Sequence, residues 1–365
     1  MIALHHLGKL ITLYRKRLRS KAESLIALLS YSSNPLQIIP VLLLYTTRYG
    51  AMDVSLSKIG VQKKIRISSN NVDYFIGLIK AIHKLRPYVK VLGDTIVVNK
   101  DDLRIKIDLN NISSENLRYF MEFLMTYSVL LRHAKIIKSL RDELMYIELE
   151  DGTKWVVRKG VLSDLALGVI LPEHEWYEYN LWFSKFIKKV KTFIDVGAYI
   201  GGYSVRACKE EVYTISIEPD PDNFTLLSTN IVLNDCESMV KLLNVAASDR
   251  NETITLYTVQ DPKNINVVGK GIPKTKVKAV PLDEVLSDKD LERPLMIKID
   301  VEGFEHRVVK GLRKILQNAR YVMVEIHPEN RDEVLKFMRS LGFKTKDRFL
   351  VSKTKGDFNY IFEKL

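Results

Sequence analysis

The C-terminal part of the chain, from residue 192 onward, alternates short apolar runs with amphipathic segments. The apolar runs predict strands at Thr192–Val196, Val212–Ile217, Val240–Ala246, Leu295–Ile299 and Tyr321–Ile326. The amphipathic segments predict helices at Gly202–Glu211, Asp222–Leu233, Leu282–Leu286, Glu305–Gln317 and Arg331–Leu341. Such strand–helix alternation is typical of an α/β fold with a doubly wound, mostly parallel sheet.

The last strands follow a different pattern. Thr253–Val259 predicts a strand before a polar loop over Gln260–Lys276. At the end of the chain, Phe343–Lys346 and Asn359–Glu363 flank a Lys355-Gly356 turn. Two strands joined this tightly should be antiparallel, so we expect a late antiparallel strand in the sheet.

The first 140 residues predict an α+β accessory region of unknown role. Leu4–Leu29 has leucines at helical spacing and a basic run, which indicates an amphipathic helix. Strands are predicted at Val54–Ile59, Lys64–Ile67, Thr95–Val98 and Leu103–Leu109, and helices at Asn70–Leu85 and Ser114–Leu140. We therefore expect two domains, 1–140 and 141–365.

A connecting stretch precedes the α/β pattern. The Asp-Gly turn between Met145–Leu149 and Lys154–Arg158 predicts a β-hairpin, and Ser163–Ile170 predicts a helix. Glu173–Phe186 is rich in aromatic residues and predicts a helix over the end of the sheet. Its aromatic side chains fit either core packing or a wall beside a cationic ligand, because cations are attracted to aromatic faces.

The bulk composition narrows the class of protein only a little. The 365 residues, 46% of them hydrophobic, suit a soluble globular protein. The net charge of +12 fits an acidic partner such as RNA, an anionic membrane or an anionic glycan, although the positive charges are spread along the chain. The basic N-terminal helix is the expected site of any membrane or RNA contact.

The same features indicate a cytoplasmic protein, with a membrane-peripheral location left open. The longest apolar stretch, Ile38–Tyr45, is too short to span a bilayer, and no secretory signal is expected in Met1–Ser30. Cys208 and Cys236 are expected to be small apolar fillers in a reducing compartment, because two cysteines form no disulfide framework.

The sharpest chemical motif begins where the first predicted strand ends. Asp195 closes that strand and is followed by a turn that contains Gly197, Ala198, Tyr199 and Gly201. Glycine lets a ligand approach the backbone closely. A dinucleotide site would need G-x-G-x-x-G, and an acid before the first glycine would repel a pyrophosphate, although it could lie near the ammonium of a methionine moiety. The spacing therefore favours S-adenosylmethionine as the cofactor.

Two further places contribute candidate cofactor-binding residues. Glu218 and Pro219 follow the second strand, about twenty residues on, where an acid binds a ribose diol in related sheets. Ala246 and Ala247 follow the third strand, where small side chains would fit a flat adenine ring. Together with the glycine turn, these residues predict an adenosine-containing ligand.

The candidate catalytic residues stand at the ends of the fourth and fifth strands. Asp300 and Glu302 follow the fourth strand, and His327 follows the fifth. Ligands bind beyond the carboxyl ends of such strands, so these side chains should line the crevice. They are candidates to orient or deprotonate an acceptor, with His327 as general base. The sequence shows no cluster of metal ligands, and we assign no metal.

These motifs resemble the FkbM-type family of S-adenosylmethionine-dependent methyltransferases. The resemblance rests on Asp195-Val-Gly-Ala-Tyr-Ile-Gly201, Ile217-Glu-Pro-Asp-Pro221, Ala247-Ser-Asp249, Val280-Pro-Leu-Asp-Glu284, Ile297-Lys-Ile-Asp-Val-Glu-Gly303 and Glu325-Ile-His-Pro328. Ser163-Asp164-Leu165 resembles the family's upstream extension. Tyr199 departs from the Asn that is common in the family, so contacts at the methionine end should differ.

The resemblance covers about half of the chain, from Asp195 to about Phe343, and leaves the first 140 residues unexplained. It implies a Rossmann-like methyltransferase sheet and O-methylation, often of a sugar or polyketide hydroxyl. An RNA methyltransferase stays open because of the net charge, although no RNA-binding module is recognisable. A non-catalytic protein with this fold is a third alternative, against which the intact Asp195, Gly197, Glu218 and Asp300 argue.

Overall fold

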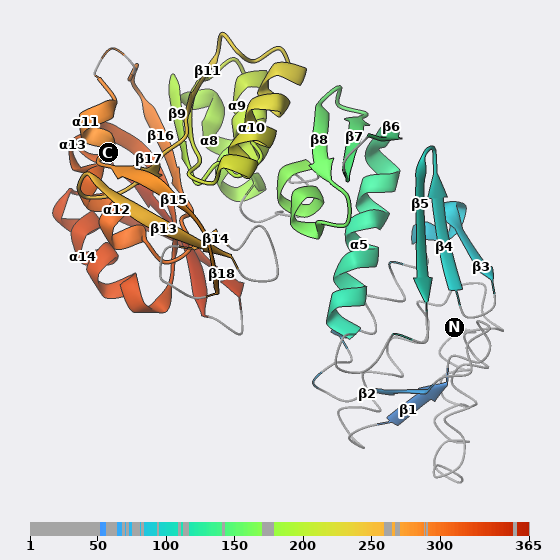
Figure 1. The fold of residues 1–365 in the computed structure, drawn as a ribbon. Helices are drawn as coiled ribbons and strands as arrows, with labels where there is room; N and C mark the ends of the chain where they lie inside the picture. The colour runs from blue at the N-terminus through green and yellow to red at the C-terminus, as the bar shows by residue number, and fades with distance from the viewer. Residues whose placement is uncertain are drawn as a thin grey trace, which may run out of the picture. The chain divides into compact units, whose positions relative to one another are not determined.

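The computed structural model divides into two compact units, Met1–Lys138 and Ser139–Leu365. The described residues are 52–55, 64–67, 70, 73–74, 81, 84–92, 95–108, 111, 117–140, 143–169, 179–258, 265–266, 271–287, 289, 291–352 and 356–364. The predicted basic helix at Leu4–Leu29 lies outside them. Each unit has its own set of strands and helices (Figure 1).

The first unit contains two small antiparallel sheets and one long helix. Strands β1 (Met52–Ser55) and β2 (Lys64–Ile67) pair with each other. Strands β3 (Val89–Leu92), β4 (Thr95–Lys100) and β5 (Leu103–Asp108) form a meander. The sequence did not predict β3.

The helix predicted over Ser114–Leu140 is shorter than expected. Helix α5 spans Leu117–His133, and strand β6 then runs over Ala134–Ser139. That stretch contains two consecutive β-branched residues, Ile136 and Ile137, which favour a pleated strand over a helix. A salt bridge between Arg118 and Glu122, one helical turn apart, lies on the exposed face of α5.

The second unit begins with the predicted hairpin of β7 (Leu144–Leu149) and β8 (Lys154–Arg158). In its turn, Thr153 donates hydrogen bonds from its backbone N–H and hydroxyl to Asp151. The hairpin contacts helix α10 (Pro221–Leu233). The Asn230 side chain of this helix accepts a hydrogen bond from the backbone N–H of Val156 at 2.7 Å. The predicted helix after the hairpin is a short π-helix, η5 (Asp164–Val169).

A seven-stranded sheet forms the body of the second unit, with strand order β11-β10-β9-β16-β17-β19-β18. Its strands are β9 (Thr192–Val196), β10 (Tyr213–Ile217), β11 (Val240–Leu243), β16 (Leu295–Ile299), β17 (Ala319–Ile326), β18 (Lys344–Ser352) and β19 (Asp357–Glu363). Strands β11, β10, β9, β16 and β17 are mutually parallel, and β19 is antiparallel to both of its neighbours. The doubly wound sheet and the late antiparallel strand are therefore confirmed.

Helices cover both faces of this sheet (Figure 1). Successive side chains of a strand point to opposite faces, so apolar residues on both faces must be covered. On one face, Ile194, Ile297 and Val322 pack in a core with residues of α12 (Glu305–Gly311), α13 (Arg313–Asn318) and α14 (Arg331–Ser340). On the other face, the neighbouring residues Phe193, Met296 and Met323 pack in a second core with α9 (Gly202–Lys209).

The described aromatic residues before β9 belong to this second core. They lie in η6 (Tyr179–Phe183) and α8 (Ser184–Phe186), where Trp182, Phe183 and Phe186 are buried. Phe183 contacts Phe193 edge-on, with ring centroids 5.5 Å apart. Of the two interpretations of this segment, core packing is the one that these three side chains satisfy.

A second sheet in this unit was only partly predicted, with strand order β12-β15-β13-β14. Its strands are β12 (Ala246–Ala247), β13 (Glu252–Thr258), β14 (Ile265–Asn266) and β15 (Ile272–Val280). The predicted third strand Val240–Ala246 therefore splits between the two sheets. The predicted loop Gln260–Lys276 overlaps β15. This strand is rich in lysine and has few buried positions, so it lacks the apolar run by which buried strands are recognised.

The helix predicted over Glu305–Gln317 breaks at Leu312, between α12 and α13. Helix α12 comes very close to the second sheet at Gly311. A Cβ at Gly311 would lie 1.8 Å from the Ser248 carbonyl oxygen, so only glycine fits there.

The expectation of unpaired cysteines is wrong. Cys208 in α9 and Cys236 after α10 form a disulfide, with Cα atoms 6.1 Å apart. The sequence separates them by 28 residues. The fold brings them together because α9 and α10 are consecutive helices that flank the same strand, β10.

Candidate active site

The glycine turn joins β9 to α9 at the carboxyl edge of the sheet. Gly197 and Gly201 have φ values of +83° and +95°, which favour glycine. The backbone N–H groups of Gly197 and Ala198 both donate to the Ile217 carbonyl oxygen, at 2.9 and 3.0 Å. These bonds fix the turn against the end of β10, next to Glu218.

Tyr199 lies at the centre of the turn and has a positive φ of 53°, which is uncommon for a residue with a side chain. Its hydroxyl donates to Asp164, lies 3.1 Å from the Ser163 hydroxyl, and accepts a 3.0 Å hydrogen bond from Arg158. Arg158 also binds Asp164 through two guanidinium nitrogens, at 2.9 and 2.7 Å. The hairpin and η5 therefore hold the glycine turn through the residue that replaces the family's usual Asn.

This network also fixes the ionisation of the phenol. Burial, followed by the neighbouring Asp164 carboxylate, raises the pKa of Tyr199, so its hydroxyl stays neutral and can donate. The motif Ser163-Asp164 was the only sequence signal for the network. Arg158 was not predicted, because the sequence does not show that β8 ends beside the glycine turn.

Glu218 lies directly beneath the turn. Its two carboxylate oxygens accept hydrogen bonds from the backbone N–H groups of Tyr199 and Asp220, each at 2.9 Å. Burial raises the pKa of Glu218 to about 8, although these two hydrogen bonds favour the ionised form. The predicted ribose-binding acid is thus adjacent to the glycine turn. The carbonyl oxygen of the next residue, Pro219, accepts a hydrogen bond from Asn244 at 3.2 Å.

Asp220 and Lys274 stand beside this acid. Asp220 caps helix α10 by accepting hydrogen bonds from the backbone N–H groups of Asp222 and Asn223. Lys274 of β15 lies 2.6 Å from Asp220 and 2.8 Å from Asp222. Lys274 was missed because it falls in the segment predicted as a loop.

The other predicted cofactor residues are buried near the same edge. Asp195 accepts a 2.7 Å hydrogen bond from the Ser204 hydroxyl of α9, which in turn accepts one from Ser216. Ala246 and Ala247 form β12 and are buried. Contact of Asp195 with a methionine ammonium, and of the two alanines with adenine, stay predictions.

The fourth strand brings its acids to the carboxyl edge of the sheet. Asp300 follows β16 and pairs with Lys298 at 2.9 Å, where the lysine side chain is 5% exposed and the Asp300 side chain 34%. Glu302 has a positive φ of 48°. Backbone strain of this kind is often found at functional sites.

His327, after β17, lies between two acids of the fourth-strand loop and α12. Its Nδ1 atom is 2.8 Å from Glu305, and its Nε2 atom is 3.7 Å from Glu302. Burial by itself would lower the pKa of His327, but the hydrogen bonds to Glu302 and Glu305 outweigh it and raise the pKa to about 11. The neighbouring carboxylates therefore favour the protonated form of the ring.

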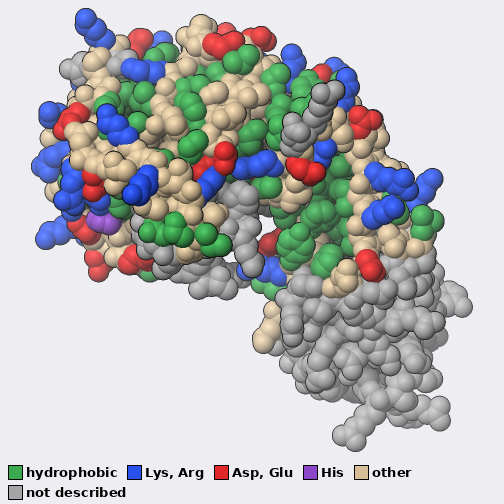
Figure 2. Space-filling view, viewed as in Figure 1, with side chains coloured by type: hydrophobic (Ala, Val, Ile, Leu, Met, Phe, Trp, Pro, Cys, Tyr) green, Lys and Arg blue, Asp and Glu red, His purple; other side chains and the backbone are tan. Residues whose placement is uncertain are grey.

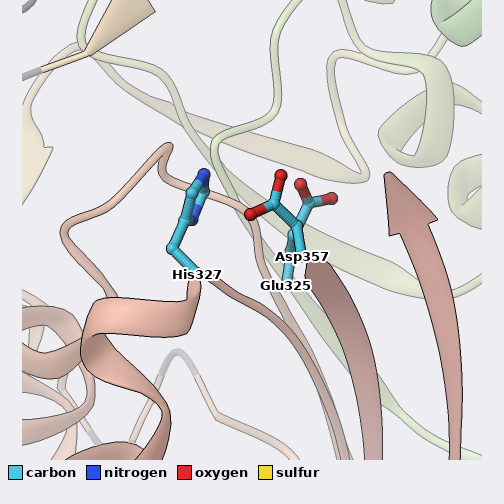
Figure 3. A group of neighbouring side chains, drawn as sticks. All are labelled: Glu325, His327 and Asp357. Carbon is cyan, nitrogen blue, oxygen red and sulfur yellow. The ribbon is translucent and has the colours of Figure 1, made fainter. Parts of the chain in front are cut away.

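The structure also brings together side chains that the sequence did not connect. One ligand atom from each of Glu325, His327 and Asp357 lies within 4.8 Å of the other two. Figure 3 shows the three side chains together. Glu325 and His327 belong to a quoted motif. Asp357 was missed, because only the antiparallel pairing of β19 with β17 places it there.

One face of the molecule shows how its charged side chains are distributed. Lys and Arg side chains are spread over the face drawn in Figure 2 and are interspersed with Asp and Glu. In the part of the chain that the structure describes, no helix has the length and apolar character needed to cross a membrane.

The strand order, the antiparallel β19 and the glycine turn at the end of β9 define a Rossmann-like fold of the methyltransferase class. The sequence profile of the methyltransferase FkbM domain matches residues 195–345. The chain belongs to this FkbM methyltransferase family.

Two curated relatives support this assignment. The chain is 30% identical over 193 residues to methyltransferase sdnD of Sordaria araneosa, and the match covers 42% of this chain and 74% of that protein. It is also 30% identical over 137 residues to the hexuronic acid methyltransferase AglP of Haloferax volcanii. That match covers 36% of this chain and 54% of the relative, so the chain spans only about half of that protein's length.

Solved structures of methyltransferases are similar at a lower level. The M. jannaschii tRNA m1G37 methyltransferase has 17% sequence identity and a TM-score of 0.34, covering 62% of this chain and 58% of that one. An rRNA methylase from Streptococcus thermophilus has 13% identity and a TM-score of 0.34, covering 53% and 96%. Because these scores are low, the fold assignment rests on the strand order, the antiparallel β19 and the glycine turn.

Proposed function

We propose that the chain transfers a methyl group from S-adenosylmethionine to a hydroxyl of a sugar or glycan. The observation that carries this proposal is the hydrogen bond from the Tyr199 backbone N–H to Glu218. It joins the glycine turn to the acid of the second strand, beside the point where strand order reverses between β9 and β16. Adenosine ligands bind at this point in open α/β sheets, with the acid on the ribose diol.

Methyl transfer is an in-line displacement, so the enzyme gains most from aligning the acceptor oxygen, the methyl carbon and the sulfur. The acceptor would lie beyond the ends of β16 and β17. Asp300 is the partly exposed acid there and is oriented by Lys298. We propose that Asp300 or Glu302 takes up the hydroxyl proton, and that His327, which lies beside Glu302 and Glu305, orients the acceptor oxygen.

The acceptor class is the least constrained part of the proposal. One relative is named as a hexuronic acid methyltransferase, which favours a sugar acceptor. The net charge of +12 would suit an anionic glycan. A hexuronic acid can be methylated on a hydroxyl or on its carboxylate. Methylation of a hydroxyl gives an alkali-stable ether, whereas methylation of the carboxylate gives an alkali-labile ester.

Calorimetric titration of the full chain with S-adenosylhomocysteine tests the cofactor. We expect one site per chain, weakened about tenfold or more in Glu218→Gln, and unchanged in Glu237→Gln, an exposed acid of the turn before β11. Binding of NADH in place of S-adenosylhomocysteine would overturn the proposal.

Radiolabelled S-adenosylmethionine tests the acceptor. Alkali-stable label on hexose- or hexuronate-containing glycans is the expected result. Label that appears on RNA and on no glycan would favour the RNA methyltransferase instead, and salt-sensitive RNA binding would accompany it.

A further inference from the structure

Three neighbouring strands change from apolar to polar side chains at the same edge of the sheet. On the α9 side they read, toward that edge, Met296-Lys298-Asp300, Met323-Glu325-His327 and Ile361-Asn359-Asp357. The register places Glu325 opposite Asn359 and Ile326 opposite Phe358, so His327 and Asp357 come one step further along. The polar ends therefore lie next to one another at this edge, beside the candidate catalytic acids.

We propose that Glu325, His327 and Asp357 form a binding site for a divalent cation. Each offers one ligand atom, and the three atoms lie within 4.8 Å of one another. Two ligands that share an ion of this kind, each about 2.1 Å from it, lie at most about 4.2 Å apart, so a small closure would complete the site. Figure 3 shows the imidazole of His327 beside both carboxylates, which come from β17 and β19.

The burial of the ligands supports a cation rather than a solvated acidic surface. Asp357 is 2% exposed, and Glu325 is partly buried. Carboxylates taken out of water are costly unless a cation or hydrogen bonds compensate them. Glu302 and Glu305 add two further carboxylates around the same imidazole, and their negative charge also favours a divalent cation here.

Glu305 holds His327 in place through its own hydrogen bonds. Glu305 is fully buried and accepts hydrogen bonds from the Gly303 backbone N–H at 2.7 Å and from the Asn330 side chain at 2.6 Å. The same carboxylate lies 2.8 Å from His327 Nδ1. A carboxylate on one ring nitrogen is the usual support of a metal-ligating histidine, whose other nitrogen, here Nε2, then binds the ion in place of its proton.

The mixed donor set indicates the kind of cation. Carboxylates suit hard ions such as Mg²⁺ and Mn²⁺, whereas imidazole suits Zn²⁺, Fe²⁺ and related ions. Mn²⁺ accepts both and is the probe we choose. If the proposed methyltransferase function holds, an ion here could bind the acceptor hydroxyl and lower its pKa, but binding of the ion does not depend on that function.

The test is calorimetric titration of the chelator-treated full chain with Mn²⁺. We expect one site per chain, weakened about tenfold or more in Asp357→Asn and in Glu325→Gln, and about 10–100-fold in Glu305→Gln through its support of the histidine. Asp347→Asn, an exposed acid on the adjacent strand β18, is the matched control and should bind as the unmodified chain does.

Crystals of the unmodified chain soaked in Mn²⁺ provide a measurement that no variant can confound. An anomalous peak bonded to Glu325, His327 and Asp357 is expected. The absence of Mn²⁺ binding, or a peak elsewhere with all variants binding normally, would overturn the site. Titration with S-adenosylhomocysteine in the same metal-free samples separates the two proposals, because cofactor binding without Mn²⁺ binding contradicts only the cation site.

Discussion

Gly197 lies directly against the backbone of Asp300: a Cβ added to Gly197 would come within 1.8 Å of the Asp300 carbonyl oxygen. The first residue of the candidate cofactor turn therefore packs on the candidate catalytic loop without room for a methyl group. The backbone of Asp300 is also bonded to the end of β9, because the Asp300 N–H donates to the Val196 carbonyl oxygen at 3.0 Å. The two halves of the site are held at a fixed spacing by this contact.

Gly197→Ala should therefore damage stability and cofactor binding together. The substitution adds a clash with backbone to the strain of a residue at φ +83°, and we expect a loss of about 3–5 kcal/mol in the free energy of unfolding. Gly152→Ala is the matched control, because Gly152 has the same φ but no atom within 4 Å of the added Cβ. Urea unfolding should show a loss of only about 1–2 kcal/mol there, with S-adenosylhomocysteine binding retained. Equal losses in the two variants would contradict the close contact.

Tyr199→Phe tests whether the hairpin supports the glycine turn. The change removes the hydroxyl that links Arg158, Ser163 and Asp164 to the turn, and leaves the Arg158–Asp164 pair intact. We expect a cost of about 1–3 kcal/mol and about tenfold weaker binding of S-adenosylhomocysteine. Tyr213→Phe, which changes a partly buried tyrosine of β10, is the control. Unchanged binding in Tyr199→Phe would show that the network only stabilises the fold.

Glu218 should give the ligand-free protein a characteristic pH dependence. Folding raises the pKa of this carboxyl from 4.5 to about 8, so between these values the folded chain keeps a proton that the unfolded chain has released. The contribution of this carboxyl to the free energy of unfolding is therefore largest below about pH 4.5. That contribution falls as the pH rises toward 8, by up to about 1.4 kcal/mol per pH unit. Urea unfolding across pH 5–8 should show a flatter dependence for Glu218→Gln than for Glu237→Gln. The same slope in both variants would refute the assignment.

The disulfide makes a prediction about reducing agents. The disulfide closes a loop of 28 residues and so restricts the unfolded chain. In the entropic account this stabilises the folded protein by about 3–4 kcal/mol. Reductant should therefore lower the urea midpoint of the unmodified chain and leave that of the Cys208→Ala, Cys236→Ala double variant unchanged. If reductant has no effect on either protein, the two cysteines are not paired in solution.

Patterns that repeat within a single element were readable from the sequence. Strands β9 and β16 bury every residue, so Thr192–Val196 and Leu295–Ile299 were placed to the residue. Strand β15 escaped detection, because its exposed lysines leave few buried positions. The end of α5 was misplaced because helical spacing does not distinguish apolar residues of a helix from those of a short strand that follows it.

The sequence by itself determined the class of fold, the glycine turn and the acids at the strand ends, because each depends on residues close together in the chain. Tertiary structure decided which of them meet. The Arg158–Asp164–Tyr199 network, the disulfide between Cys208 and Cys236, and the approach of Asp357 to Glu325 and His327 all join segments whose pairing depends on strand register and helix packing. The glycine turn could be identified from the sequence. The partners of its Tyr199 could not, because β8 comes beside the turn only in the folded chain.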